Sequence, residues 1–493
     1  MSNHYRRDFL ETVAASATAL SAIGVATAAD GRDQYVVTVR GKETRSRLDR
    51  TDADVLASVA DGQVLLVAAE SAASVRGVTG VVDVRENLGY RPVGPQERST
   101  AESLDEELAP RQWDKQADTT GAFQAHDTAT GDGRTVAIID TGIDTAHPDL
   151  RNSVERGMLF RVDGNSSPGG SPTVAGDTTI EARLPPAGES IAPYIYLGSP
   201  DTRTQAAADD VDSHGSHCAG IATARHHGDD IGIAGMAPDA EVVPLRVFYW
   251  KEYEGYPYDV DGDGEAESVT VTTLWTTDFD ILSAIDYAGE IGADAANMSL
   301  GGGVIKGAAH QDGEHVAYQR VVQSAVQRGT VVTTSAGNAD ADLQHEGYYT
   351  LPNSVPGSIS VSATAPNNER TFYSNYGTSD IDVGAPGGGY ETLEKTLAED
   401  TAWPFPLNLV LSTVPPDLND GLAYDWYAGT SMAAPQVAGL VALVREVNPA
   451  LSAGQVQNVI ETTARYSDGS GDEDVGAGIV YAPGAVAEAE ARR

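Results

Sequence analysis

The chain has 493 residues and a formal net charge of −40, from 72 acidic residues against 32 Lys and Arg. The acidic residues are spread along the sequence, which argues against an acidic interaction tail and a polyacidic mimic of nucleic acid, and no nucleic-acid partner is expected. Such charge is typical of salt-adapted proteins, because salt screens self-repulsion and shortens the Debye length to about 3 Å at 1 M. We therefore predict that the protein needs high salt to stay folded.

The first residues predict an export signal. Arg6-Arg7-Asp8-Phe9-Leu10 is a twin-arginine pattern, a mildly apolar stretch follows, and Ala26-Thr27-Ala28 offers a small-residue cleavage site. A short amphipathic helix with two chance arginines is the alternative. We predict a signal peptide over residues 1–28 that directs Tat-type export to the cell exterior. No apolar run is long enough to span a membrane and the only cysteine is Cys218, so neither a membrane anchor nor an intrachain disulfide is expected.

A separate small domain is predicted over residues 31–108. Strands are expected at 34–40, 63–69 and 81–85, and helices at 51–60 and 71–76, which together favour an α+β sandwich. The acidic stretch Pro92 to Pro110 is bounded by prolines and is typical of a linker.

Residues 110–493 alternate strands and helices as crossover units do, so we predict a three-layer α/β sandwich around a mostly parallel sheet. Apolar runs predict strands at 135–139, 241–246, 295–299, 331–335, 359–361 and 381–383. Longer runs predict helices at 214–224, 279–289, 314–328, 431–447 and 453–463. Insertions or enlarged loops are expected at 164–200, 248–277 and 387–427.

Three polar residues stand at the ends of predicted elements. Asp140 follows an apolar strand, at the mouth of the sheet where α/β folds place their sites. His214 opens a helix of small residues, and Ser431 opens an apolar helix whose first N–H groups are free. Each residue also has a purely structural explanation: the Asp could cap a turn, the His could pack in the core, and the Ser could be a helix N-cap. Their order along the chain is nevertheless a known order of a nucleophilic triad.

Five motifs resemble those of the subtilisin-like serine proteases, the subtilases. Three would carry the triad, namely Asp140-Thr141-Gly142-Ile143-Asp144, His214-Gly215-Ser216-His217-Cys218-Ala219-Gly220 and Gly429-Thr430-Ser431-Met432-Ala433-Ala434-Pro435. Met298 to Gly302 resembles the segment that pairs with substrate, and Ser335 to Asn338 resembles the oxyanion-hole segment. The resemblance covers residues 110–485. The histidine motif contains Cys218, which resembles the motif of the proteinase K-like branch. The acidic composition and the predicted export resemble those of the halolysins.

The resemblance implies a serine endopeptidase that acts on proteins and peptides without a catalytic metal. His214 would take the proton of Ser431 and give it to the leaving amine, while Asp140 would orient His214. The amide of Asn338 and the backbone N–H of Ser431 would stabilise the oxyanion. The residues expected to line the substrate cleft are Ser299, Leu300, Gly301, Ser335, Ala336 and Gly337.

The resemblance also implies a zymogen. Residues 31–108 are similar to the propeptide of subtilases, an intramolecular inhibitor that assists folding and is cut off, and the mature enzyme is expected to be a monomer. The alternative function is a catalytically silent subtilase-like module that binds proteins or calcium. The intact motifs, including Asn338, favour the enzyme.

Structural calcium is expected at two places. Asp259, Asp261 and Asp263 alternate as in the start of a calcium loop, with Gly264 at the sixth position and Thr270 where a bidentate Glu would stand. A solvated acidic turn is the alternative there. By resemblance alone, Asp382 matches a calcium-binding aspartate of proteinase K-like enzymes, together with the carbonyls of Pro356 and Ser358.

Overall fold

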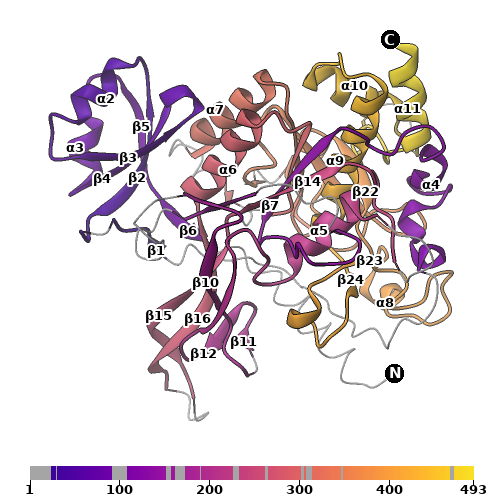
Figure 1. The fold of residues 1–493 in the computed structure, drawn as a ribbon, viewed down its shortest axis with the longest axis horizontal. Helices are drawn as coiled ribbons and strands as arrows, with labels where there is room; N and C mark the ends of the chain where they lie inside the picture. Colours follow the sequence, from indigo (N-terminus) through magenta and orange to yellow (C-terminus); the bar gives the residue numbers. More distant parts are fainter. Residues whose placement is uncertain are drawn as a thin grey trace.

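A computed structural model provides the structure of the chain (Figure 1). It describes residues 24–28, 30–90, 108–150, 157–161, 173–188, 190–225, 232–260, 265–300, 305–306, 314–345, 348–466 and 471–493. Within these ranges, none of the helices combines the length and the apolar character that a membrane span requires.

The centre of the molecule is an eight-stranded sheet with the order β22-β21-β19-β17-β7-β14-β8-β9. All neighbours are parallel except β8 and β9, which confirms the predicted mostly parallel α/β sheet. The strands are β7 Thr135–Asp140, β8 Met158–Phe160, β9 Thr173–Ala175, β14 Glu241–Arg246, β17 Ala295–Met298, β19 Val331–Ser335, β21 Ser358–Thr364 and β22 Val383–Pro386. The strand predicted at 381–383 is wrong in its start, because the N–H groups of Asp380 and Ile381 both bond the Gly377 carbonyl in a turn.

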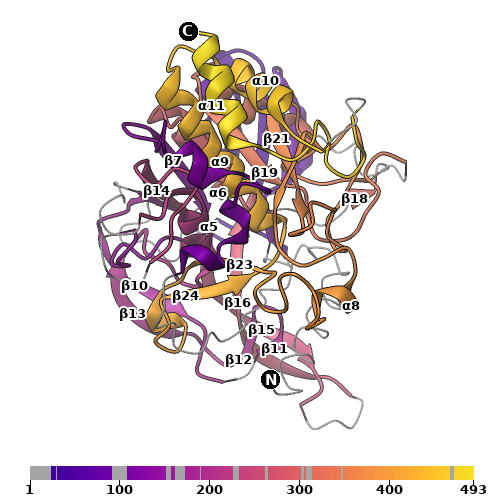
Figure 2. The same cartoon turned by 90° about the vertical axis from the view of Figure 1, so that its right-hand side faces the viewer.

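Helices cover both faces of this sheet, as the three-layer prediction requires (Figures 1 and 2). Successive strand residues point to opposite faces, so Val136 and Ile138 join one core while Ala137 and Ile139 join the other. The first core contains α5 His214–Thr223, α9 Thr430–Val447, α10 Ala453–Thr463 and α11 Ala482–Ala491. The second contains α6 Asp278–Glu290 and α7 Glu314–Gln327.

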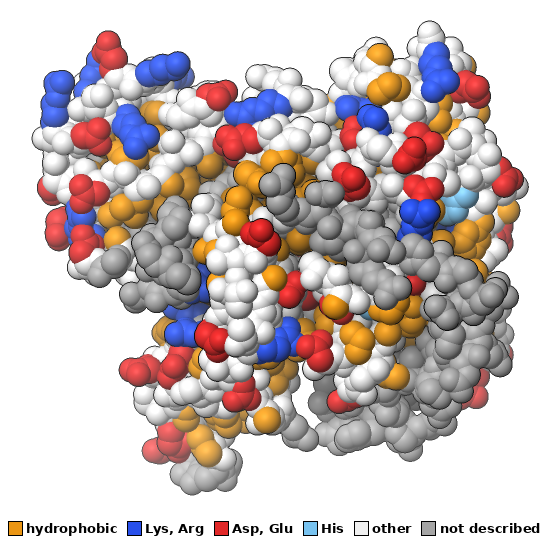
Figure 3. All heavy atoms as spheres, viewed as in Figure 1, with side chains coloured by type: hydrophobic (Ala, Val, Ile, Leu, Met, Phe, Trp, Pro, Cys, Tyr) orange, Lys and Arg blue, Asp and Glu red, His pale blue; other side chains and the backbone are white. Residues whose placement is uncertain are grey.

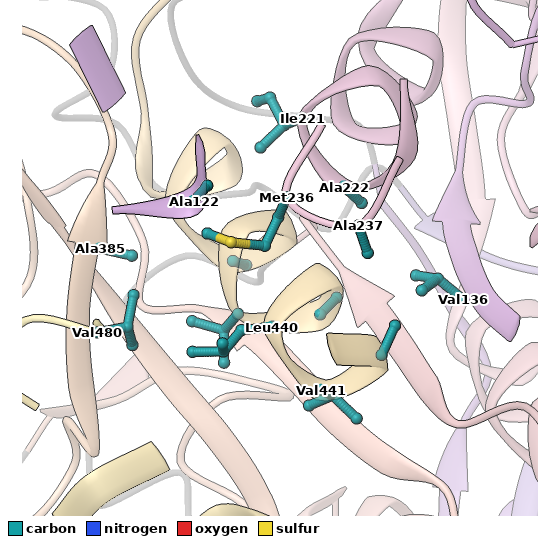
Figure 4. Packing of buried hydrophobic residues seen from close by; sticks show 14 of the residues in the cluster. Ala122, Val136, Ile221, Ala222, Met236, Ala237, Ala385, Leu440, Val441 and Val480 are labelled. Atoms are coloured by element: carbon teal, nitrogen blue, oxygen red, sulfur yellow. The ribbon is translucent and has the colours of Figure 1, made fainter. Parts of the chain in front are cut away.

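Helix α9 is buried along nearly its whole length. Val437, Leu440 and Val441 have no exposed surface, and Figure 4 shows Leu440 and Val441 beside Met236 and Val136 in this core. Pro435 lies inside the helix and has no N–H for the Ser431 carbonyl, which instead accepts the Ser299 hydroxyl at 2.7 Å. The start of α9, which carries Ser431, is therefore fixed by a large apolar core.

The N-terminal unit, residues 30–90, lies beside α6 and α7 (Figure 1). Its antiparallel sheet has the order β3-β4-β2-β5, with β2 Asp33–Val39, β3 Asp54–Val59, β4 Val64–Ala69 and β5 Val81–Glu86. Helices α2 Glu43–Leu48 and α3 Ala72–Arg76 accompany it. The helix predicted at 51–60 is wrong: a turn with positive φ at Ala60 and Asp61 folds this segment back, so Asp54–Val59 pairs with β4.

The region predicted as an insertion at 248–277 forms a long hairpin of β15 Tyr249–Tyr258 and β16 Glu267–Thr277. The end of β16 also pairs with β6 Leu88–Tyr90, the last described strand of the N-terminal unit. The remaining elements are short. They are β1 Gly24–Val25, β10 Thr179–Leu184, β11 Ser190–Ala192, β12 Ile195–Leu197, β13 Asp201–Ala206, β18 Ile305–Lys306, β20 Tyr348–Tyr349, β23 Val410–Thr413, β24 Tyr424–Tyr427, α4 Ala122–Ala125 and α8 Leu393–Thr396. Of these, β23 and β24 are buried in the first core.

Candidate active site

The candidate site lies where three elements end or begin at the carboxyl edge of the sheet. Asp140 is the last residue of β7, His214 is the first residue of α5, and Ser431 is the second residue of α9. Open α/β sheets place ligands at this edge. Helices α5 and α9 pack on each other and on β7, so the three residues are held by the core and not by mobile loops.

Asp140 and His214 form a close pair. Nδ1 of His214 lies 2.8 Å from Oδ1 and 2.9 Å from Oδ2 of Asp140. Only 1% of the Asp140 side chain is exposed, and its Oδ1 also accepts the N–H of Thr141 at 2.7 Å. Burial disfavours the charged imidazole, but the adjacent carboxylate outweighs it and raises the pKa of His214 well above its ordinary value. With Nδ1 facing Asp140, Nε2 is the ring atom left to act on a substrate proton.

Ser431 is held against Ser299. Its hydroxyl donates to the Ser299 carbonyl at 3.1 Å, and the Ser299 hydroxyl donates to the Ser431 carbonyl at 2.7 Å. The thiol of Cys218 donates to the same Ser431 carbonyl at 3.4 Å, and its sulfur lies 3.9 Å from Nδ1 of His214. One buried sulfur thus contacts both His214 and the backbone of Ser431. A hydroxyl can rotate between acceptors, so the bond to Ser299 leaves Ser431 able to face His214.

Two N–H donors converge beside Ser431. A Cβ atom built on Gly429 would lie 3.4 Å from Nδ2 of Asn338 and 3.6 Å from the backbone N of Ser431. The glycine therefore leaves open a small space that both donors border. The other end of the Asn338 amide is fixed, because its Oδ1 accepts the N–H of Thr430 at 2.9 Å and the Thr430 hydroxyl at 2.8 Å. This arrangement directs Nδ2 toward the open space, as an oxyanion donor requires.

Asn375, which the sequence interpretation missed, holds the loop that carries Asn338. Its Nδ2 donates to the Ala336 carbonyl at 2.9 Å, and its Oδ1 accepts the N–H groups of Ala339 and Ala341 at 3.0 Å each. Gly337 lies between them with φ +98°, where a Cβ would come 2.6 Å from Nδ2 of Asn375. A buried Asn in a segment without a motif gives no sequence signal for this role.

Asp210 is a second residue that the sequence interpretation missed. It is 1% exposed, and its Oδ1 accepts the Thr141 hydroxyl at 2.8 Å and the N–H groups of Asp212 and Ser213 at 3.0 Å each. Its Oδ2 accepts the N–H of Ser216 at 2.9 Å and its hydroxyl at 2.6 Å. One carboxylate thus joins the residue after Asp140 to both sides of His214. It also holds Ser213 at φ +121°, a backbone conformation that costs energy for a non-glycine residue.

Comparison with known proteins accounts for this arrangement. The model of the subtilase family matches residues 131–478, which is more than half of the chain. The chain belongs to the subtilase family. An extracellular protease of Xanthomonas campestris pv. campestris is 32% identical over 366 residues, which are 74% of this chain and 53% of that protein. Thermitase of Thermoactinomyces vulgaris is 29% identical over 351 residues, 71% of this chain and 88% of its own.

Solved structures agree with the subtilase fold. Fervidolysin of Fervidobacterium pennivorans superposes with a TM-score of 0.61 and 22% identity. The superposition covers 95% of this chain and 64% of the fervidolysin chain. The epidermin leader peptide processing protease of Staphylococcus aureus gives a TM-score of 0.64 and 19% identity, over 92% of this chain and 98% of its own. Several of the similar curated proteins are longer, and the chain spans about half the length of the Xanthomonas protease.

The neighbouring carboxylates and histidines of this subtilase have structural partners. Oδ1 of Asp144 accepts the N–H of Ala146 in the loop after β7, and burial raises the pKa of Asp144 to about 6. His147 is neutral: burial lowers its pKa to about 4, and its Nε2 bonds the Ala423 carbonyl at 2.7 Å. His217 stacks on Tyr427 at 4.1 Å between ring centroids, and burial lowers its pKa to about 3.

The predicted cleft residues lie around the same edge of the sheet. Ser299 and Leu300 follow β17 directly, and Ser335 ends the adjacent strand β19 and leads into Ala336 and Gly337. Gly301 lies outside the described residues. The backbones of both segments therefore start from neighbouring parallel strands at the site.

Of the predicted calcium-binding aspartates, the structure describes Asp259 and Asp382, and neither belongs to a cluster of three metal-ligating side chains within the described ranges. Among the described residues, the only group of three potential metal-ligating side chains is Asp140, His214 and Cys218. Asp259 stands near the tip of the β15–β16 hairpin, and Asp261 and Asp263 lie outside the described residues. Asp382 accepts the N–H of Ser360 at 2.7 Å and the Gln457 amide at 3.4 Å.

Proposed function

We propose that this subtilase is a serine endopeptidase, made as a self-processed zymogen and exported by the Tat route. The observation that carries the proposal is the convergence of the Asp140–His214 pair, the start of α9 with Ser431, and the two donors beside Gly429. A serine hydroxyl is a poor nucleophile by itself, and this arrangement supplies the base and the charge stabilisation that it lacks.

In the first half of the reaction, Nε2 of His214 takes the proton as Oγ of Ser431 attacks the peptide carbonyl. The imidazolium that forms is stabilised by the buried Asp140 carboxylate at 2.8 Å. The carbonyl oxygen becomes an oxyanion and receives hydrogen bonds from Nδ2 of Asn338 and N–H of Ser431, which border the same space. His214 then protonates the leaving amine, and water releases the acyl group by the reverse sequence of proton transfers.

The zymogen proposal rests on the placement of the N-terminal unit. Its sheet packs on α6 and α7, and β6 adds to the edge of β16 at Gly89–Thr277 and Tyr90–Thr276. Hairpin β15–β16 reaches the His214 loop, since Nε1 of Trp250 donates to the Val211 carbonyl at 2.7 Å. A segment that lies along this border and leads into the linker obstructs the cleft until it is cut. The unit is therefore an intramolecular inhibitor of the enzyme.

The setting that we propose is a salt-rich exterior, in a halolysin-like or proteinase K-like enzyme. Acidic side chains are scattered over the face shown in Figure 3 and are not gathered in one patch, which agrees with the charge of −40. The substrates are proteins and peptides, and the mature enzyme acts as a monomer.

Structural calcium belongs to the same proposal. Asp382 fits a cation: burial, together with the nearby carboxylates of Glu461 and Asp380, raises its pKa to about 6. A divalent ion held there would favour the charged form of this carboxylate and stabilise the loop before β22. Asp259, with Asp261 and Asp263, would hold a second ion at the hairpin tip.

The proposal is tested by expressing the full chain beside its Ser431→Ala variant in high salt with calcium. We expect the parent chain to shorten near residue 110 and to hydrolyse casein, while the variant stays long and inert. If both chains are processed alike and neither cleaves casein, the protein matures through another protease and acts as a binding module.

A further inference from the structure

One charged residue stands apart from the machinery described so far. Asp278 is the first residue of α6, and its side chain is 1% exposed. Nη1 of Arg85, from β5 of the N-terminal unit, lies 3.2 Å from Oδ2 of Asp278. The Arg85 side chain is itself only 7% exposed. A buried pair between two units is uncommon, because both charges must lose their water.

Tyr318 of α7 completes the surroundings of the Arg85 guanidinium. Its ring centroid lies 5.8 Å from Cζ of Arg85, and its hydroxyl donates to Oδ1 of Asp278 at 3.1 Å. The planar cation therefore has a carboxylate on one side and an aromatic face on another, with the carboxylate oriented by a third group. Arginine suits this geometry better than lysine, since its flat guanidinium stacks on rings and keeps its charge when buried.

The chain that follows Arg85 folds around the same carboxylate. Oδ2 of Asp278 accepts the N–H of Leu88 at 3.3 Å and the Tyr90 hydroxyl at 3.2 Å. In addition, Oδ1 of Asn87 accepts the N–H of Phe279, one of the free donors in the first turn of α6. Asp278 and its surroundings thus bind a short segment in which an arginine is followed by a strand that pairs with β16.

The position of Asp278 ties this contact to the active site. It directly follows Thr277, the last residue of β16, which pairs with Gly89. The partner strand β15 donates from Trp250 to the carbonyl of Val211, three positions before His214. Asp278 therefore lies at the end of the hairpin whose other strand bonds the segment leading to His214.

We propose that Asp278 and Tyr318 form a guanidinium-binding site. In the precursor it holds Arg85 of the N-terminal unit. In the processed enzyme the site selects polypeptide substrates that carry an arginine on the N-terminal side of the cleaved bond. The number of residues between that arginine and the bond matches the number between Arg85 and the linker. The substrate part of this inference rests on the proposed endopeptidase function, whereas the grip on the N-terminal unit does not.

The binding of Arg85 by Asp278 and Tyr318 is tested on the full chain in the Ser431→Ala background, where no self-processing is expected. Hydrogen exchange of the Leu88 and Gly89 amides is compared among Arg85→Ala, Arg85→Lys and Asp278→Asn. We expect protection to fall by about tenfold or more in Arg85→Ala and Asp278→Asn, with a smaller fall in Arg85→Lys. Arg50→Ala and Glu290→Gln, at exposed positions of the same two units, are the matched controls and keep their protection. Equal protection in all variants overturns the site.

Selection is tested with two synthetic peptides that copy residues 81–115, one with Arg85 and one with neutral citrulline in its place. With the processed enzyme, we expect KM to be about tenfold lower for the arginine peptide at equal kcat, and Asp278→Asn to abolish the difference. Glu290→Gln retains it. Equal cleavage of both peptides by an enzyme that hydrolyses casein overturns selection. Failure to cleave either peptide or casein refutes the endopeptidase function instead, and the exchange result then decides the guanidinium site alone.

Discussion

The two faces of the central sheet are covered in different ways. On one face, α9 is buried among small and aliphatic side chains, and Gly439 lies so close to Met236 and Ala222 that no side chain fits. On the other face, α6 and α7 lie between the central sheet and the sheet of the N-terminal unit. That second cover combines the apolar residues Val36 and Leu66 with buried charges.

The charges on the second face bond across the boundary between the two units. Oδ2 of Asp286 accepts the N–H of Ala60 at 3.1 Å, and Arg320 donates to the Val39 carbonyl at 2.8 Å. The N-terminal unit also has a core of its own, formed by residues such as Val37, Leu48 and Val67. Separation of the two units would expose Val36 and Leu66, which share a core with α6 and α7, but it would leave the unit's own core and the α9 face packed. The comparison teaches that Ser431 starts a helix on the face packed within one unit, whereas the other face is shared with the N-terminal unit that the proposed processing would remove.

The largest expected effect comes from disturbing the α9 face. Gly439→Ala should abolish folding or nearly so, because its Cβ would lie 2.6 Å from Cβ of Met236 and 2.8 Å from the Ala222 carbonyl. Gly454→Ala in α10 is the matched control, since nothing lies within 4 Å of its Cβ, and it should stabilise by about 0.4–1 kcal/mol. Thermal unfolding in high salt measures both. Equal melting temperatures would show that the α9 face is more plastic than described.

Removing the oxyanion donor should lower turnover without loosening either face. We expect Asn338→Ala to reduce kcat by about 10²–10³ with little change in KM, because the donor acts on charge that develops in the transition state. Casein and peptide hydrolysis at saturating substrate measure this effect. Unchanged kcat in a folded Asn338→Ala enzyme would mean that the donors beside Gly429 do not face the reacting carbonyl.

Asp210→Asn should slow the reaction by misplacing His214. An amide in place of the carboxylate would point its two N–H donors at groups that themselves donate hydrogen bonds. These groups include the N–H and the hydroxyl of Ser216. We expect kcat to fall about tenfold or more, with KM unchanged. Asp209→Asn is the matched control next in the chain, where the carboxylate bonds Thr145 and Ala206 outside this network. The two variants would behave alike if Asp210 only stabilised the loop.

The pH dependence follows from the raised pKa of His214. A protonated imidazole cannot accept the Ser431 proton, so kcat/KM should rise as pH passes through the folded-state pKa, above the ordinary value of 6.5. The attraction between Asp140 and the imidazolium stabilises the fold fully below that ordinary value, and this contribution is lost as pH rises through the folded-state pKa. In Asp140→Asn the rising limb should move to lower pH and the plateau should fall by about 10⁴. A pH–rate profile with the same limb in both enzymes would contradict the assignment.

The sequence predicted those parts of the molecule that local patterns determine. Apolar runs predicted β7, β14 and α9 within a residue of their bounds, because nearly all residues of each are buried. The segment Asp54–Val59 was mistaken for a helix, since its strand character comes from pairing with β4 and from the turn at Ala60 and Asp61.

The site shows the same division. Motifs led to Asp140, His214, Ser431 and Asn338, which the structure gathers at one edge, although their roles stay predictions. Asp210 was missed because its importance arises from Thr141, 69 positions away in the chain. Asp278 was missed for a similar reason, since its partner Arg85 belongs to another unit. Long-range polar bonds leave no local pattern in the sequence.

The claim that Ser431 is the activated nucleophile of this subtilase is tested most directly by its reaction with a fluorophosphonate. Variants that do not process themselves are first cut by added parent enzyme and then separated from it. The parent enzyme and its variants are incubated with the reagent in high salt, and the site of modification is mapped by peptide mass spectrometry. We predict a single adduct on Ser431 that is absent from His214→Ala and slow to form in Asn338→Ala, while Asp209→Asn reacts as the parent does. Labelling of another residue, or equal labelling of Ser431 in His214→Ala, would contradict the account.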